Sequence, residues 1–199
     1  MENDAGRLVV AISGASGVIL GIRMLEALRP MPIEAHLVLS PAARLTIQQE
    51  TSWKVKDITD LADVFYNHAD ITAPLASGSY RTRGMVIIPC SVKTLSAVAN
   101  SYSNDLISRA ADVTLKEGRP LVLVVRESPL HLGHLRLMTR AVEIGAIIVP
   151  PVPAFYVKPK DVDQMIDHMV GRVLLRLGIE NRLYSEWKGA REELDSDGI

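Results

Sequence analysis

The feature that most constrains the fold is a series of short, uninterrupted apolar runs, each separated from the next by a stretch with helical periodicity. The runs have the length of strands, and β-branched residues are common in them. Strands that are apolar on both faces are typical of parallel sheets covered by helices on each side. We therefore predict an α/β fold with strands at residues 8–12, 35–39, 85–88, 121–125 and 146–149.

Between these runs, apolar residues recur at the three- and four-residue spacing of amphipathic helices. Ser40 followed by Pro41 is a helix-start signal, because serine can cap free amide groups and proline has a preset φ. The predicted architecture is a doubly wound, mainly parallel sheet of five to six strands in a Rossmann-like or flavodoxin-like three-layer sandwich. The predicted helices cover residues 18–28, 42–50, 58–64, 93–99, 105–117, 132–143 and 162–177.

Length and composition narrow the class of protein. A chain of 199 residues suits a single domain, which we assign to residues 1–199 with a tail from about residue 185. The net charge of -1, with dispersed basic residues, favours neither nucleic acid nor a membrane surface. The single Cys90 excludes an internal disulfide, and His131 with His134 has no third metal ligand. No apolar run approaches the roughly 20 residues of a membrane span, and the polar start is unlike a signal peptide, so we expect a cytoplasmic protein.

Ligands of doubly wound sheets bind beyond the carboxyl ends of the strands, so the residues after each apolar run are the first candidates. The SGASG loop at 13–17 lets the backbone approach an anion, although a tight strand-to-helix turn explains it equally well. Ser91 is interpreted first as a helix N-cap and Cys90 as a small buried hydrophobe. Arg126 and Glu127 directly follow an apolar strand, where a charged pair is hard to explain as core, so we assign them a functional role.

Four other residues have a structural and a functional interpretation. Lys116 lies at a helix end, where the dipole alone favours a cation, and Arg172 fits the solvated face of an amphipathic helix. Glu50 closes a helix, where the dipole disfavours a carboxylate, and this mismatch hints at another task. Tyr156 lies in a proline-bounded loop from which a phenol could reach a phosphate.

Four segments, spread over most of the chain, carry a family signature. They are AISGASG at 11–17, SGSYRTRGMVIIPCSVKTLSAVA at 77–99, VGRVL at 170–174 and the run LISRAADVTLKEGRPLVLVVRESPLHLGHLRLMTRAVEIGAIIVPPVPAFY at 106–156. In them the chain resembles the UbiX-type flavin prenyltransferases. The resemblance implies transfer of the dimethylallyl group of dimethylallyl monophosphate to N5 and C6 of reduced FMN, without a metal. The prenylated FMN would then serve a UbiD-type decarboxylase, which explains an older description of the family as aromatic-acid carboxy-lyases.

The resemblance also implies roles for individual residues. Those matched to the FMN site are Gly14, Ala15, Ser16, Ser40, Ser91, Thr94 and Arg126. Those matched to the dimethylallyl phosphate site are Lys116, Glu127, Tyr156 and Arg172. Ser16 and Glu50 would relay protons beside the flavin, and Glu127 would keep a proton on the phosphate. Ser16, Glu50 and Glu127 are therefore the candidate catalytic residues.

The chain departs from the family pattern at two positions, and two alternative functions remain to be tested. Ile71 stands where some members have tryptophan, so any cation–π contribution of that ring is absent. Glu186 precedes Trp187 where the family often has arginine, which puts shielding of the site in doubt. The resemblance implies a homo-oligomer, with a dodecamer as one candidate size and neighbouring subunits completing the site. The alternatives are an FMN-dependent cysteine decarboxylase and a non-catalytic flavin carrier, but a carrier needs no second phosphate site.

Overall fold

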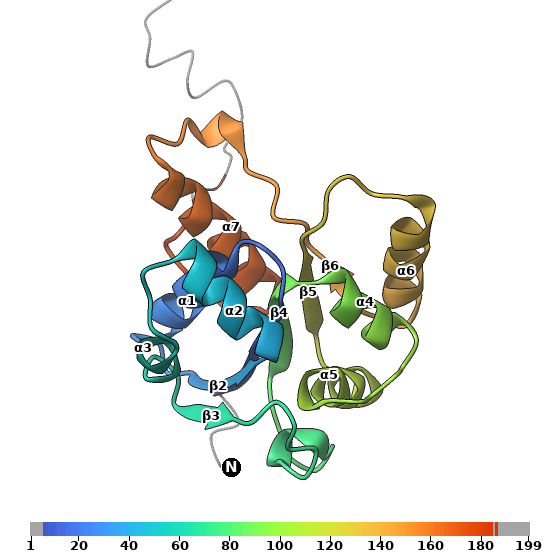
Figure 1. The fold of residues 1–199 in the computed structure, drawn as a ribbon. Coiled ribbons are helices and arrows are strands. Elements are labelled where there is room, and N and C mark those ends of the chain that lie inside the picture. Colours follow the sequence, from blue (N-terminus) through green and yellow to red (C-terminus); the bar gives the residue numbers. More distant parts are fainter. Residues whose placement is uncertain (1–5, 185, 187–199) are drawn as a thin grey trace, which may run out of the picture.

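The computed structural model describes residues 6–184 and 186. Its centre is a parallel sheet with the strand order β3-β2-β1-β4-β5-β6 (Figure 1). The chain extends this sheet first to one side of β1 and then, from β4 onward, to the other, which creates a switch point between these two strands. The strands are β1 (Arg7–Ile12), β2 (Glu34–Leu39), β3 (Val64–Tyr66), β4 (Gly84–Cys90), β5 (Leu121–Val125) and β6 (Ile147–Ile148).

Helices cover both faces of the sheet (Figure 1). One buried core lies under α1 and α7, with contributions from α2 and α3, and the other lies under α4, α5 and α6. Every residue of β4 and β5 is buried, as expected for strands between two helical layers. The helices are α1 (Val18–Leu28), α2 (Pro41–Glu50), α3 (Val55–Thr59), α4 (Val92–Ala99), α5 (Leu106–Lys116), α6 (Leu132–Glu143) and α7 (Val162–Arg176), with short 3-10 turns η1 (Pro74–Ala76) and η2 (Phe155–Val157).

The predicted fold class is confirmed, and most predicted elements lie within two residues of the observed ones. The Ser40 hydroxyl accepts the backbone N–H of Ala43 at 3.0 Å, so the predicted N-cap of α2 is also confirmed. Local signals were sufficient here because the caps and the apolar runs that they border are encoded in neighbouring residues.

The prediction of a helix over residues 58–64 is wrong. The helix α3 ends at Thr59, and Val64 begins a short strand in which it pairs with His36 of β2. Valine, phenylalanine and tyrosine in this segment favour strands. A three-residue edge strand is too short for periodicity to reveal, and only its pairing with β2 defines it.

Gly21 allows α1 to lie directly on the sheet. A Cβ at this position would overlap the Ile88 carbonyl oxygen and lie 2.7 Å from Ile12 Cδ1. Because a backbone oxygen cannot move aside cheaply, we expect Gly21→Ala to lower the free energy of unfolding by about 1–3 kcal/mol. Urea denaturation followed by circular dichroism measures this loss. Gly6→Ala is the matched control, since its Cβ would make ordinary contacts of 3.5 Å with the Pro32 carbonyl oxygen and 3.7 Å with the Glu34 backbone nitrogen. An equal loss in both variants would contradict the explanation.

Candidate active site

The carboxyl ends of β1 and β4 are tied together by Ser13, which is the first residue after β1 and is 1% exposed. Its hydroxyl donates to the Pro89 carbonyl oxygen at 2.9 Å and accepts the backbone N–H of Ser91 at 2.7 Å. These bonds hold the SGASG loop beside the loop that follows β4. The two loops therefore meet at the switch point, where doubly wound sheets bind their ligands.

The SGASG loop is packed closely against the start of α2. A Cβ on Gly14 would overlap the Ala42 side chain and lie 3.3 Å from Ala42 Cα, so glycine is required there. Gly17 has a φ of 95°, in the left-handed region that glycine adopts readily. The backbone N–H of Ser40 donates to the carbonyl oxygen of Ile12 at 3.0 Å. The structure thus brings Ser40 to the same strand end as residues 14–16.

Glu50 reaches from the last position of α2 to the start of α1. Its carboxylate accepts the backbone N–H groups of Gly17 at 2.8 Å and Val18 at 3.4 Å, and it hydrogen-bonds with the Ser16 side chain. Partial burial opposes ionisation, but these hydrogen bonds and the charge of Arg126 hold the pKa of Glu50 below its usual range. Its position at one helix C-terminus is therefore offset by contact with another helix N-terminus. Ser16 and Glu50 are thus brought together, as predicted.

The loop after β4 presents two paired hydroxyls. Ser91 Oγ accepts the backbone N–H of Thr94 at 3.3 Å and lies 3.1 Å from Thr94 Oγ1, so its interpretation as an N-cap is confirmed. Cys90 beside it is fully buried, and burial raises the pKa of its thiol, which makes it a poor nucleophile. The hydroxyl pair lies at the amino end of α4, where free backbone N–H groups and the hydroxyls can form hydrogen bonds with the polar edge of a ligand ring.

Arg126 and Glu127 follow β5 and are exposed at the same edge of the sheet, as the sequence predicts. The backbone N–H of Arg126 donates to the Cys90 carbonyl oxygen at 3.1 Å, which fixes this end of β5 against β4. Glu127 Oε1 accepts the backbone N–H of Ser128 at 2.9 Å. The charged pair is therefore held on ordered backbone beside the switch point.

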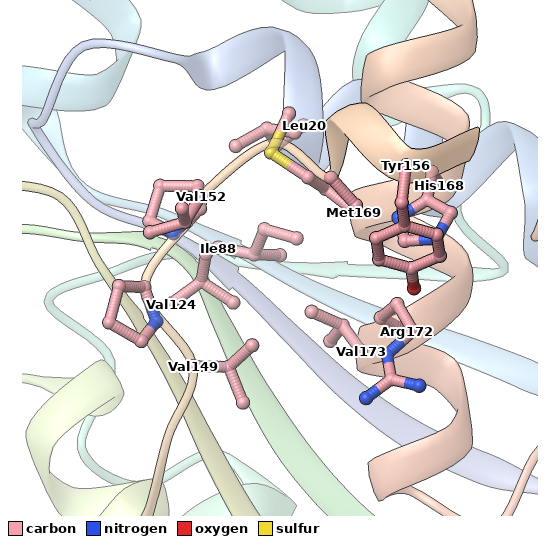
Figure 2. Close-up of a pocket in the computed structure, with 13 residues that line it drawn as sticks. Leu20, Ile88, Val124, Val149, Val152, Tyr156, His168, Met169, Arg172 and Val173 are labelled. Atoms are coloured by element: carbon pink, nitrogen blue, oxygen red, sulfur yellow. The ribbon is translucent and has the colours of Figure 1, made fainter. Parts of the chain in front are cut away.

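A cavity of about 230 Å³ lies between α7, the sheet and the segment that follows β6 (Figure 2). Tyr156, His168 and Arg172 form one wall, and aliphatic side chains face them (Figure 2). His168 is not among the predicted site residues, although its four-residue spacing from Arg172 places both on one face of a helix. The aliphatic side includes Leu20, Ile88, Val124, Val149, Val152 and Met169. Such a lining suits a small apolar group attached to an anion.

Lys116 does not lie at this edge in the same chain. It ends α5, before β5 begins, whereas Glu127 comes after β5, and the five residues of that strand span roughly 17 Å. The Lys116 ammonium donates to Glu117 Oε1 at 2.6 Å and lies against Gly78. Within one chain, the structure therefore places Tyr156 and Arg172 in one cavity but leaves Lys116 at the opposite edge of the sheet.

The remaining predictions concern metals, membranes and the two departures. His131 Nδ1 accepts the backbone N–H of Gly133 at 3.0 Å and caps α6, which agrees with a structural role. Within residues 6–184 and 186, no group of three or more His, Cys, Asp or Glu side chains could hold a metal ion. In the same part of the chain, no helix is long and apolar enough to cross a membrane. Ile71 is exposed, and Trp187 lies outside the described residues.

The fold defines an α/β protein with a doubly wound parallel sheet, and the candidate site lies at its switch point, where such sheets bind ligands. A family model described as Flavoprotein matches residues 1–173. The chain is 56% identical over 187 residues to the flavin prenyltransferase UbiX of Escherichia coli strain K12, which covers 92% of this chain and 99% of that protein. This chain belongs to the Flavoprotein family and, within it, to the UbiX-type flavin prenyltransferases, as the sequence predicts.

Solved structures support the same placement. AnUbiX, solved in complex with FMN and dimethylallyl pyrophosphate, is 47% identical with a TM-score of 0.91, over 92% of this chain and 98% of that one. A dodecameric FMN-dependent UbiX-like decarboxylase from Escherichia coli O157:H7 is 48% identical with a TM-score of 0.90, over 92% and 100% of the two chains. An FMN-dependent cysteine decarboxylase is only 18% identical with a TM-score of 0.60, and it shows the fold alone.

Proposed function

We propose that this chain joins the dimethylallyl group of dimethylallyl phosphate to reduced FMN. The observation that carries the proposal is the cavity in which Tyr156 and Arg172 face an aliphatic wall. The proposed donor has the same two parts, a phosphate and a branched five-carbon group. The relative in complex with FMN and dimethylallyl pyrophosphate supports both substrates, because it shares this fold at 47% identity.

In the proposed reaction, the allylic carbon–oxygen bond breaks, phosphate leaves as an anion, and the freed carbon forms a bond to N5 of the flavin, which releases the proton that it carries in reduced FMN. A second bond then joins the prenyl group to C6. As this ring closes, the prenyl double bond takes up one proton and C6 releases one. The reaction therefore needs donors for the departing phosphate and a proton carrier beside the flavin.

The residues divide between these tasks. Arg172 and Tyr156 would donate hydrogen bonds to the departing phosphate, where charge develops. Glu127 would keep a proton on a phosphate oxygen, since a carboxylate and a fully ionised phosphate would repel each other. Ser16 and Glu50 would carry the proton. The loops that would hold FMN contribute Gly14, Ala15, Ser16, Ser40, Ser91, Thr94 and Arg126.

We propose in addition that the enzyme is a homo-oligomer in which a neighbouring subunit supplies Lys116 to the phosphate site. Lys116 lies too far from Arg172 to join it within one chain, and the dodecameric UbiX-like relative supports an assembly of this kind. The product would pass to a UbiD-type decarboxylase. Reduced flavin as a substrate fits a reducing cytoplasm.

Mixed oligomers test the shared site. We expect Lys116→Ala and Arg172→Met each to form little prenylated FMN alone, because each lacks one phosphate contact. Oligomers assembled at random from equal amounts of both should recover about a quarter of the wild-type activity, since that fraction of sites receives both intact residues. A chain carrying both substitutions, mixed with Lys116→Ala, is the control and should recover nothing. Mixed oligomers that stay inactive would show that Lys116 does not act across a subunit boundary.

The two alternatives have weaker support. The cysteine decarboxylase shares only the fold with this chain, at 18% identity. A flavin carrier would not need a cavity with an arginine and a tyrosine opposite an aliphatic wall. Turnover of a peptidyl cysteine without phosphate would favour the first alternative, and FMN binding without any chemical change would favour the second.

A further inference from the structure

His168 is a polar residue in the cavity wall that the roles above leave unused. It lies on α7, one helical turn before Arg172, and is 6% exposed. Its ring stands edge-on to the Tyr156 ring, with centroids 6.0 Å apart and an interplanar angle of 86° (Figure 2). His168 therefore shares the cavity with the two groups assigned to the phosphate.

The Nε2 atom of His168 is buried without a partner. Among the described residues, none forms a hydrogen bond with it, although it is shielded from solvent. Buried polar atoms in native proteins are nearly always paired, and an exception needs an explanation. His168 lines the cavity, so a ligand bound there would explain the nitrogen if it supplied the missing partner.

The charge around His168 favours a neutral ring. Burial, and then the positive charge of Arg172, lower the pKa of His168. The aromatic rings of Tyr156 and Tyr184 are its other neighbours, while Asp167 beside it is paired with Arg23. A neutral imidazole offers one N–H donor, so it adds a hydrogen bond to an anion without adding a second cation beside Arg172.

We propose that His168 is a further substrate-binding residue, whose Nε2–H donates a hydrogen bond to an oxygen of the same phosphate that Arg172 binds. Side chains four residues apart on a helix are neighbours, so one tetrahedral anion can contact both. This inference rests on the proposed function, because the phosphate belongs to the dimethylallyl donor.

Three variants of the FMN-loaded full-length protein test this role. His168→Phe keeps an aromatic ring but removes the donor, and we expect it to raise the KM for dimethylallyl phosphate about tenfold, with a smaller change in kcat. His168→Gln places an amide N–H near the former Nε2 position and should restore most of the affinity. His168→Asn is the matched control, since its shorter amide places the donor near the Nδ1 position and should not restore it.

Calorimetric titration with inorganic phosphate separates this inference from the proposed function. Wild-type protein that binds phosphate more tightly than His168→Phe, but transfers no prenyl group, would support the contact while overturning the proposed function. Equal phosphate affinity in the wild type and His168→Phe, or equal rescue by glutamine and asparagine, would overturn the assignment of His168. FMN affinity and thermal stability measured on each variant show whether a loss is confined to the phosphate.

Discussion

Replacing Glu50 with glutamine should slow prenyl transfer by about 10²- to 10⁴-fold while FMN remains bound. The Glu50 carboxylate hydrogen-bonds with the Ser16 side chain, and its lowered pKa means that it is ionised at neutral pH and ready to accept a proton. Glutamine keeps an oxygen for the backbone N–H groups of Gly17 and Val18, which Glu50 now binds. It cannot take up a proton, so the relay would be lost while the loop is retained.

Stopped-flow absorbance under anaerobic conditions, with reduced FMN and dimethylallyl phosphate, follows closure of the new flavin ring, which is the step that needs the proton relay. Glu26→Gln is the matched control, because Glu26 lies on α1 and pairs with Arg23, away from the switch point. A Glu50→Gln enzyme that closes the flavin ring at the wild-type rate would remove Glu50 from the mechanism. Its contacts would then serve only to cap α1.

The second large effect is expected at Arg172. Replacing it with methionine should lower kcat/KM for dimethylallyl phosphate by about 10²- to 10³-fold, because a donor aimed at the charge that develops on the departing phosphate is lost. Methionine is unbranched and retains much of the packing of the arginine stem, so the cavity should keep its shape. FMN affinity should stay unchanged, since Arg172 lines the cavity proposed for the prenyl donor and is not part of the loops proposed to hold FMN.

Arg176→Met is the control for the loss of one positive charge from α7. Arg176 is exposed in the last turn of the helix and does not line the cavity. Steady-state kinetics on both variants, with FMN affinity from fluorescence quenching, distinguish a specific loss of prenyl-donor binding from a general effect of removing a positive charge. If Arg172→Met lost FMN as well, or if both variants lost the same activity, the assignment of Arg172 to the prenyl donor would be wrong.

Much of the fold could be predicted from local signals. The apolar runs identified five of the six strands, and the Ser40–Pro41 signal identified the start of α2. The strand β3 escaped because its three residues are defined by pairing with β2, which is a tertiary property. The role of Ser13 is likewise a tertiary property that local signals do not reveal, because its two hydroxyl hydrogen bonds join residues more than seventy positions apart.

The candidate site was predicted less completely, for physical reasons. The pairing of Ser16 with Glu50 followed from the family resemblance. The mismatch of Glu50 with its helix dipole hinted independently only that this residue has another task. The resemblance placed Lys116 in the phosphate site with Arg172. Within one chain, however, the two residues lie at opposite edges of the sheet, because Lys116 comes before β5 and the cavity lies beyond its other end. A buried nitrogen without a partner, as in His168, becomes visible only when all neighbours are placed.

The most direct test of the central claim is a mass spectrum of the flavin released after anaerobic reaction. The purified protein would be loaded with FMN, reduced, and incubated with dimethylallyl monophosphate, with the pyrophosphate in a parallel reaction. We predict a flavin heavier by one isoprene unit with at least one of the two donors. Unchanged FMN with both donors, from protein that binds the flavin tightly, would contradict prenyl transfer and favour a carrier or a cysteine decarboxylase.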